Sequence, residues 1–162
     1  LKTYIGIDNG VSGSVGIINN VGSSYFKTPT IKQQNYTKTK KNISRLDVVA
    51  FKIIIGMYSG GDAMVVIERP MVNPGRFTAT TSALRCLEAT IIVIETLGFP
   101  YMYCDSKEWQ KVLLPSGCKG DALKSASKDI GIRLFPHLED LIKKQKDADG
   151  ILIAEWARRT GL

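Results

Sequence analysis

The sequence contains few cysteines, one histidine and no long uninterrupted apolar run. Cys86, Cys104 and Cys118 are far apart and odd in number, so they match neither a zinc-ligand spacing nor a disulfide framework. A reducing cytoplasm is therefore the simplest expected location. The histidine, His137, follows a proline in a predicted loop with no nucleophile near it in the pattern, so we assign it no catalytic role.

Membrane and secretion signals are also lacking. No apolar run approaches the ~20 residues that a helix needs to span a bilayer, so we expect no membrane partner. The first residues lead directly into a strand-like run, which differs from a secretory signal peptide.

Basic residues, in contrast, are abundant. The chain has 22 Lys and Arg against 15 Asp and Glu, a formal net charge of +7. A surplus of this size favours a polyanionic partner, most often a nucleic acid. The length of 162 residues and the 44% apolar content suit one domain, residues 1–162, with a full core.

Apolar periodicity and turn residues predict the order β-β-β-α-β-α-β-α-α-α. Three strands in a meander, followed by strands with helical crossovers, predict an α/β fold: a five-stranded mixed sheet flanked by helices. Asn9-Gly10 is a strong hairpin signal between the first two strands. The expected strands are 4–8, 14–18, 23–27, 62–68 and 100–104, and the expected helices are 44–57, 80–97, 106–113, 121–133 and a last helix from about 147.

The segment 28–42 is polar and carries Lys32, Lys38, Lys40 and Lys41. Its composition predicts a solvated loop. We also expect this basic loop to touch a phosphate backbone.

Three carboxylates are predicted to converge at one edge of the sheet. Asp8 ends the first strand and Glu68 ends the fourth, and right-handed crossovers make these strands parallel neighbours. Asp149, in the first turn of the last helix, can lie across the same edge. Clustered carboxylates repel one another unless a cation neutralises them, and oxygen ligands favour Mg²⁺ or Mn²⁺. The pattern fits two-metal phosphoryl hydrolysis, although Asp8 alone is equally compatible with a turn cap.

These motifs carry a resemblance. Ile-Gly-Ile-Asp8-x-Gly-x-Ser-Gly, then Val-Val-Ile-Glu68-Arg-Pro, then Asp147-Ala-Asp149-Gly-Ile-Leu together resemble the RuvC family of Holliday junction resolvases, especially its bacteriophage-type relatives. The resemblance covers nearly the whole chain. It implies a ribonuclease H-like fold and a homodimer that nicks two strands of a four-way DNA junction, using two Mg²⁺ or Mn²⁺ ions per site and leaving 5′-phosphate ends. A phage source would place the protein in the host cytoplasm.

The chain departs from this family at one position. The family usually has a fourth metal-site residue, Asp or His, three or four positions before the last acidic one, where this chain has Lys146 and Gln145. Asp147 is the nearest carboxylate, but residues two apart on a helix point to nearly opposite sides. Asp147 therefore joins Asp8, Glu68 and Asp149 as a catalytic metal ligand only if it lies at or before the N-cap; otherwise it is a plain cap. If Asp147 is only a cap, Lys146 would contact phosphate.

Other residues are candidates for DNA binding. Arg69, Asn73 and Arg76 follow Glu68 closely and are expected at the mouth of the site. Phe77 either packs beneath its loop or stacks on a base. A further set lies before and along one predicted helix and either faces DNA or forms a solvated surface: Lys119, Lys124 and Lys128.

Three other functions compete with junction resolution. The Asp8 motif also resembles the first phosphate loop of kinases and actin-like ATPases, but those enzymes need a second such domain. A nuclease of the same fold acting on an RNA–DNA hybrid or flapped DNA would use the same carboxylates. A catalytically weak junction-binding protein would explain the missing fourth ligand. The apolar stripe of the 80–97 helix is expected in the core on one side and, by resemblance, in a dimer interface on the other.

Overall fold

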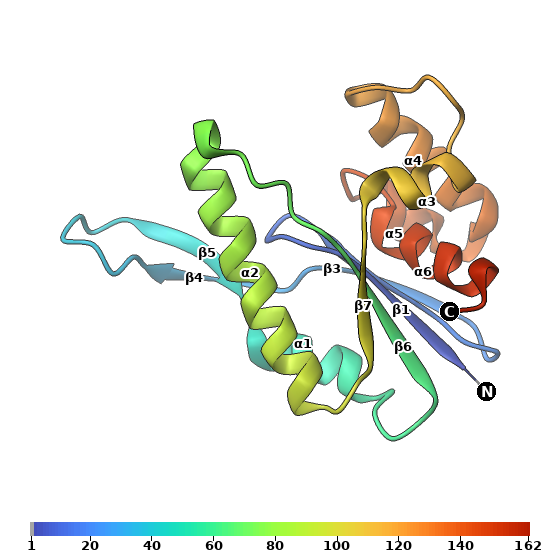
Figure 1. Ribbon diagram of the computed structural model, residues 1–162, viewed down its shortest axis with the longest axis horizontal. Coiled ribbons are helices and arrows are strands. Elements are labelled where there is room, and N and C mark those ends of the chain that lie inside the picture. Colours follow the sequence, from blue (N-terminus) through green and yellow to red (C-terminus); the bar gives the residue numbers. More distant parts are fainter. Residues whose placement is uncertain (1) are drawn as a thin grey trace.

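The central sheet has five strands in the computed structural model, which describes residues 2–162 (Figure 1). The strand order is β3-β2-β1-β6-β7. β1 pairs antiparallel with β2, β2 pairs antiparallel with β3, and β1, β6 and β7 run parallel. This confirms the predicted five-stranded mixed sheet. The strands are β1 (Thr3–Asp8), β2 (Ser14–Ile18), β3 (Ser23–Lys27), β6 (Ala63–Glu68) and β7 (Tyr101–Cys104).

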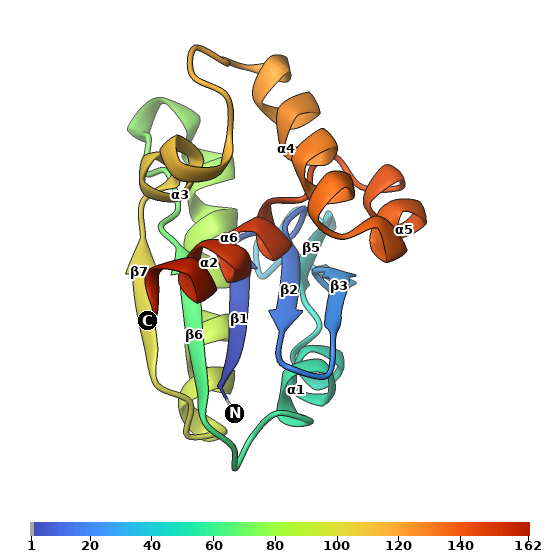
Figure 2. The same cartoon turned by 90° about the vertical axis from the view of Figure 1, so that its right-hand side faces the viewer.

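Helices cover both faces of this sheet. One apolar cluster joins α1 and α2 to one face, and a second joins the C-terminal helices to the other. Figure 2 shows α6 crossing the sheet on the face opposite to α2. The helices are α1 (Val48–Gly56), α2 (Phe77–Thr96), α3 (Ser106–Leu113), α4 (Asp121–Leu134), α5 (Glu139–Lys143) and α6 (Asp149–Thr160), with short 3₁₀ turns at Pro74–Arg76 and Pro136–Leu138.

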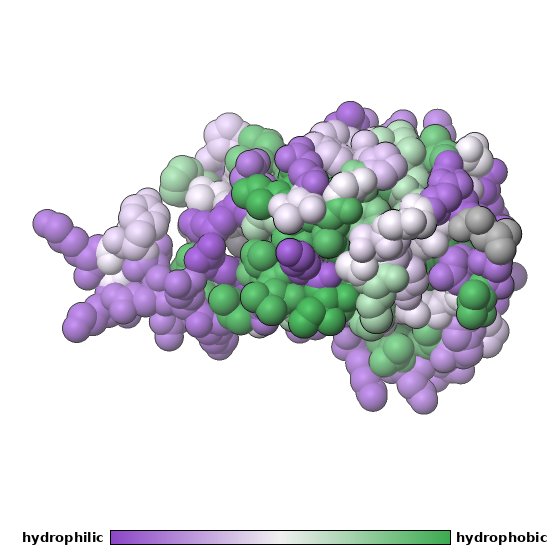
Figure 3. Space-filling view, turned by 90° about the horizontal axis from the view of Figure 1, so that it is seen from below, coloured by the Kyte–Doolittle hydropathy of each residue, from purple (hydrophilic) through white to green (hydrophobic). Residues whose placement is uncertain are grey.

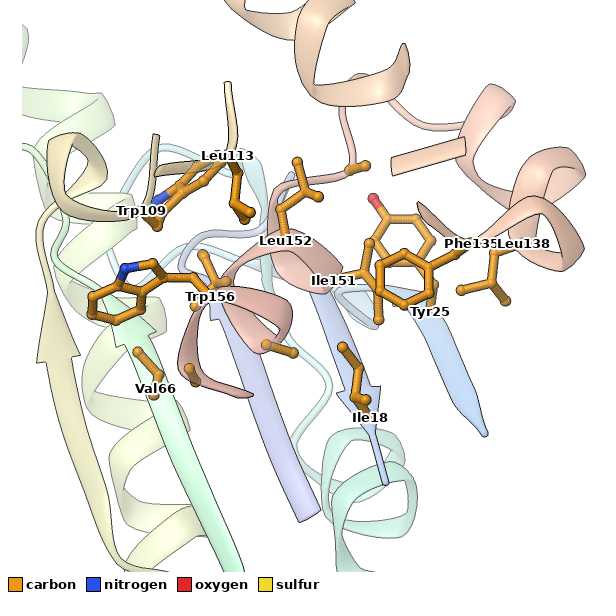
Figure 4. Packing of buried hydrophobic residues seen from close by; sticks show 14 of the residues in the cluster. Ile18, Tyr25, Val66, Trp109, Leu113, Phe135, Leu138, Ile151, Leu152 and Trp156 are labelled. Carbon is orange, nitrogen blue, oxygen red and sulfur yellow. The ribbon is translucent and has the colours of Figure 1, made fainter. Parts of the chain in front are cut away.

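α6 lies unusually close to β1 and β2. A Cβ atom on Gly6 would lie 2.3 Å from the Ala154 backbone nitrogen, and one on Gly16 would lie 2.2 Å from Cα of Ile151. Residues without side chains at these strand positions therefore let the helix backbone rest on the sheet. The side chains around this contact form the second apolar cluster, in which Figure 4 shows Trp156 and Leu152 of α6 beside Trp109 and Leu113. This packing fixes the N-terminal end of α6 over the end of β1.

The prediction of a solvated loop over residues 28–42 is wrong. β4 (Thr30–Gln34) and β5 (Asn42–Leu46) form a two-stranded antiparallel hairpin that projects from the body of the molecule (Figure 1). Every residue of β4 is exposed, so the strand lacks the apolar alternation by which half-buried strands are recognised. Backbone pairing and polar cross-strand contacts hold the hairpin instead, among them a hydrogen bond from Arg45 to Gln33.

The helix predicted from Ser44 consequently starts later. Ser44 belongs to β5, and α1 begins after Asp47, whose Oδ1 accepts a 3.0 Å hydrogen bond from the backbone N–H of Ala50. Such an N-cap satisfies one of the free N–H groups of the first turn. Residues 44–46 are thus the end of the hairpin, and Asp47 is the N-cap from which α1 begins.

α2 is more apolar than expected. By length and composition alone, the stretch Pro74–Thr96 is long and apolar enough to cross a membrane, so the expectation that no segment approaches this limit needs correction. Cys86, Thr90, Val93 and Ile94 are the buried residues of the helix and face the sheet. Only 22% of its most apolar window is buried, which leaves a second apolar face open.

Candidate metal centre

Asp8 stands at the carboxyl end of β1, next to the chain reversal that leads into β2. It pairs with Ser14 in the sheet register, and the residue is 9% exposed. Its Oδ2 is buried and accepts no hydrogen bond from any residue in the described part of the chain. A buried carboxylate oxygen without a hydrogen-bond donor is costly, so a nearby cation stabilises it, and the Nζ of Lys146 lies 3.5 Å away. The alternative is a carboxylate that only caps its own turn. Such a cap would accept a hydrogen bond from a backbone N–H of that turn, and Oδ2 of Asp8 accepts none.

Asp147 and Asp149 reach Asp8 from the N-terminal end of α6. One ligand oxygen from each of these three residues lies within 4.8 Å of the others, and no second group of this kind is found among residues 2–162. The N-cap of α6 is Ala148, so Asp147 precedes the helix, which is the condition under which it can join the site. Its Oδ1 accepts a 3.2 Å hydrogen bond from the Asp149 N–H, which satisfies a free donor of the first turn.

Two hydroxyl groups position this turn. Tyr25 of β3 donates a 2.7 Å hydrogen bond to the backbone carbonyl of Asp147. Ser127 of α4, which is 1% exposed, donates to Oδ1 of Asp149 and accepts a 2.9 Å hydrogen bond from the N–H of Ala148. Both hydroxyls come from other elements of the fold, so tertiary contacts hold the backbone at Asp147 and the carboxylate of Asp149.

Glu68 ends β6, the parallel neighbour of β1, as predicted. The Trp109 Nε1–H donates a 2.8 Å hydrogen bond to its Oε2. Glu68 lies outside the tight group of three, but it lines a cavity of about 240 Å³ together with Asp8. The four predicted metal-site residues thus meet at one sheet edge, as a close trio and a fourth carboxylate on the strand next to Asp8.

Burial makes the carboxylates hard to ionise. It raises the pKa of Asp8 well above its ordinary value, an effect that Lys146 opposes and Asp149 increases. Burial, and then the neighbouring Asp147, raise the pKa of Asp149 to about 7. Burial also raises the pKa of Glu68, although its bond from Trp109 acts in the other direction. A site of this kind holds its negative charge only when a cation is present.

Lys146 supplies one positive charge. Its Nζ lies 3.5 Å from Oδ2 of Asp8 and 3.4 Å from Oδ2 of Asp147, and its side chain is 42% exposed. The sequence predicted Lys146 as a phosphate contact, whereas the ammonium group points into the acidic trio. It remains accessible from solvent on one side.

Three of the predicted DNA-binding residues lie at the mouth of the site. Arg69, Asn73 and Arg76 line the same cavity as Asp8 and Glu68. Arg69 also forms a 2.9 Å ion pair with Asp105. The Asn73 side chain accepts a hydrogen bond from the Gly75 N–H and caps the 3₁₀ turn before α2, so it shapes the cavity wall.

Phe77 does not pack beneath its loop. Its side chain is 76% exposed, and it lines a different cavity, of about 360 Å³, between the hairpin and the start of α2. Tyr36 of the hairpin and Arg85 of α2 line this cavity too. Phe77 is therefore available to a ligand, but beside the acidic site and not within it.

The predicted basic helix has mixed roles. Lys119 and Lys124 are exposed near the start of α4, and Lys124 forms only a long 3.8 Å ion pair with Asp121. Lys128 is part-buried and donates a 3.0 Å hydrogen bond to the backbone carbonyl of Lys143, which ties α4 to α5. Of the three, Lys128 thus has a structural role in the contact between helices.

The sequence did not reveal the residues that support the carboxylates. The ring of Trp109 belongs to the core, since the residue is 0% exposed, but its indole N–H donates to Glu68. Ser127 sits among the alanines and lysines of α4 without any distinguishing pattern. One available signal was that a buried tryptophan normally requires an acceptor for its N–H.

Comparison with known proteins identifies the fold. No protein-family model and no curated protein matches the sequence. Among solved structures, Thermus thermophilus RuvC in complex with a Holliday junction substrate matches with a TM-score of 0.61 and 14% identity, over 99% of this chain and 97% of that chain. A second Thermus thermophilus RuvC structure matches with a TM-score of 0.58 and 12% identity, over 98% and 96% of the two chains. The chain therefore has a RuvC-like, ribonuclease H-like fold.

Proposed function

We propose that this protein is a metal-dependent endodeoxyribonuclease that resolves four-way or otherwise branched DNA junctions by paired phosphodiester hydrolysis, leaving 5′-phosphate ends. The observation that carries the proposal is the convergence of Asp8, Asp147 and Asp149, with Glu68 on the neighbouring strand, on one edge of a RuvC-like sheet. The structural likeness to a RuvC bound to a Holliday junction substrate supports the choice of DNA. The net charge of +7 agrees with a polyanionic substrate.

The donor set fits a hard divalent cation. All candidate ligand atoms are carboxylate oxygens, the kind that Mg²⁺ and Mn²⁺ prefer, and the buried Oδ2 of Asp8 lacks a hydrogen-bond donor. Asp8, Asp147 and Asp149 are the candidate ligands of such an ion, and Glu68 lines the cavity beside Asp8. Such an ion supplies activation of water and stabilisation of the charge that develops on phosphate oxygens.

The chain's own residues would orient the DNA around this centre. Arg69 and Arg76 line the cavity with Asp8 and Glu68, so their guanidinium groups would bind phosphates of the DNA at the mouth of the site. Trp109 and Ser127 keep Glu68 and Asp149 in one orientation, which reduces the reorganisation needed at each turnover.

Paired cleavage requires two sites, and an apolar face supports a homodimer. Val49, Ile53 and Met57 recur at spacings of four along α1 and are 65–70% exposed, and Ile92 of α2 is 53% exposed. Figure 3 shows the apolar surface gathered beside the polar hairpin. Large contiguous apolar surfaces on soluble proteins usually mark interfaces. We propose that a second copy covers this face.

The dimer is tested by light scattering coupled to gel filtration. Ile53→Lys places a charge on the apolar face and should convert a dimer into a monomer, while Lys52→Ala, on the preceding residue of the same helix, should leave the dimer intact. A wild-type monomer would favour the alternative nuclease that acts on a flap or a hybrid.

Cleavage of a mobile four-way junction tests the activity. Labelled junction, duplex, flap and RNA–DNA hybrid are compared in Mg²⁺ and in Mn²⁺ for wild type, Asp8→Asn, Asp147→Asn and Asp149→Asn. We expect symmetric nicks in the junction, and the Asp8 and Asp149 variants should bind the junction but not cut it. Cutting by Asp8→Asn at the wild-type rate would overturn the proposed mechanism.

One observation favours a second function, a junction-binding protein with weak or no nuclease activity. Lys146 lies between Asp8 and Asp147 and already neutralises part of the acidic trio. If the protein binds four-way DNA tightly but leaves it intact in both metals, this second function is correct.

A further inference from the structure

The acidic site contains a lysine at its centre. We propose that the ammonium group of Lys146 is a resident cation that takes the place of one of two divalent ions, so that each chain binds a single ion. This inference rests on the proposed function, because it concerns the same metal site. It changes the number of ions expected per site from two to one.

The contacts of Lys146 support this role. Its Nζ lies within 3.5 Å of carboxylate oxygens from both Asp8 and Asp147, which are 9% and 3% exposed. In the part of the chain that the structure describes, Lys146 is the only cationic side chain paired with either of them. The lysine therefore bridges two buried anions, as a metal ion would.

Protein donors and Lys146 already contact many of the carboxylate oxygens of the site. Oδ1 of Asp147 accepts the Asp149 N–H, and its Oδ2 faces Lys146. Oδ1 of Asp149 accepts from Ser127, and Oε2 of Glu68 accepts from Trp109. Oδ2 of Asp8 also faces Lys146. Within residues 2–162 this leaves one oxygen each of Asp8, Asp149 and Glu68 that faces neither a protein donor nor Lys146. Such a set suits one hard cation whose other positions are filled by water or phosphate.

Electrostatic repulsion by the Lys146 ammonium also favours a single ion. A divalent ion held by both Asp8 and Asp147 would be repelled by the ammonium group that already pairs with these two carboxylates. Lys146 forms no ion pair with Asp149 in the described part of the chain, so an ion held by Asp8 and Asp149 would share only one carboxylate with the lysine. The second arrangement is thus favoured as long as the lysine stays in place.

The lysine would also contribute to substrate binding. An ammonium group has three N–H donors, and the Lys146 side chain is 42% exposed toward solvent. A donor that is not used by Asp8 or Asp147 can bind a phosphate oxygen at the site. Lys146 would then supply part of the positive charge that the second metal ion provides in two-metal nucleases.

The number of ions per chain tests the proposal directly. Mn²⁺ alone is titrated into the protein without DNA, and bound Mn²⁺ is measured by electron paramagnetic resonance and by calorimetry. Wild type should bind one ion per chain. Lys146→Met, which keeps most of the length of the side chain and removes its charge, should bind two. Lys144→Ala is the matched control, an exposed lysine two residues earlier, and should bind one.

Thermal stability gives a second readout. With chelator present, Lys146→Met should unfold at a lower temperature than wild type because its carboxylates are left without a cation. Mn²⁺ should then raise its unfolding temperature by more than it raises that of wild type. Lys144→Ala should behave as wild type in both conditions.

The outcomes separate this inference from the proposed function. Two ions in wild type, or one in a folded Lys146→Met variant, would overturn the role of Lys146, whether or not the junction is cut. One ion in wild type and two in the variant, without any cleavage, would uphold it and overturn the nuclease. The absence of bound Mn²⁺ in wild type would overturn both.

Discussion

The indole N–H of Trp109 donates a 2.8 Å hydrogen bond to the carboxylate of Glu68, which links α3 to the carboxyl end of β6. The tryptophan is 0% exposed, so its ring belongs to the core while its one polar atom serves the site. Support of this kind commonly decides how well a metal ligand is oriented. The hydrogen bond makes α3 a support of the metal centre even though none of its residues belongs to the acidic trio.

Trp109→Phe should therefore reduce cleavage more than it reduces stability. The phenyl ring fills most of the same space, but Glu68 loses its donor. We expect junction cleavage to fall by about 10–100-fold, the usual effect of losing a partner of a metal ligand. Trp156→Phe is the control, since Trp156 lies in the same apolar cluster and its indole bonds to no carboxylate in the described part of the chain. Equal losses in both variants would reduce the role of Trp109 to packing.

Ser127→Ala should weaken both the fold and metal binding. The change removes the donor to Asp149 and leaves the N–H of Ala148 without an acceptor. An unsatisfied buried polar group costs about 1–3 kcal/mol, which denaturant unfolding can measure. The Mn²⁺ dissociation constant should rise as well. Ser125→Ala, at an exposed position of the same helix, should change neither quantity.

Gly16→Ala should displace α6 from the sheet. The new Cβ would lie 2.2 Å from Cα of Ile151, a backbone atom that cannot move without the helix. We expect a loss of about 3 kcal/mol in the free energy of unfolding, at the upper end of the usual cost of overpacking. Mn²⁺ affinity should fall too, since α6 carries Asp149. Gly22→Ala, with nothing within 4 Å of the added atom, should keep wild-type stability.

Without metal, the protein should lose stability as the pH rises. In the folded protein the pKa of Asp149 is raised from 3.8 to about 7, so the native state keeps a proton that the unfolded chain releases near pH 4. The carboxyl therefore destabilises the fold progressively as the pH rises from about 4 through about 7. Asp149→Asn removes this dependence. With chelator present, its unfolding temperature should equal that of wild type near pH 4 and exceed it at pH 8.

The result that would contradict this prediction is a constant difference between the two proteins at every pH. Added Mn²⁺ should also abolish the advantage of Asp149→Asn at pH 8, because an ion stabilises the ionised carboxylate in wild type only.

The hairpin should contribute to DNA binding mainly by its charge. Lys38 and Lys40 are exposed near its tip, where no ion pair holds them among residues 2–162. Replacing both with alanine should weaken junction binding and reduce the slope of log K against log salt by about 0.9 for each phosphate that the protein no longer neutralises. The control replaces Lys107 and Lys111 of α3 with alanine, which lowers the net charge by the same amount. An identical effect of this second pair would mean that only net charge matters.

The local pattern of apolar and turn residues determined much of the fold. The apolar runs and the Asn9-Gly10 turn predicted all five strands of the sheet, because buried strands depend on the burial of neighbouring side chains. Glu68 was expected beside Asp8 because parallel strands joined by right-handed crossovers end at the same edge. The hairpin of β4 and β5 was missed, since exposed strands carry no apolar alternation.

Only the tertiary structure decided how the site is completed. Trp109 and Glu68 are 41 residues apart, and Ser127 and Asp149 are 22 apart, so no local periodicity links them. Asp147 enters the site because α6 begins at Asp149, after the N-cap Ala148, and not near Asp147 as the pattern suggested. Lys146 turns inward because Asp8 and Asp147 are buried and close together, a relation that arises only when α6 rests on Gly6 and Gly16 of the sheet.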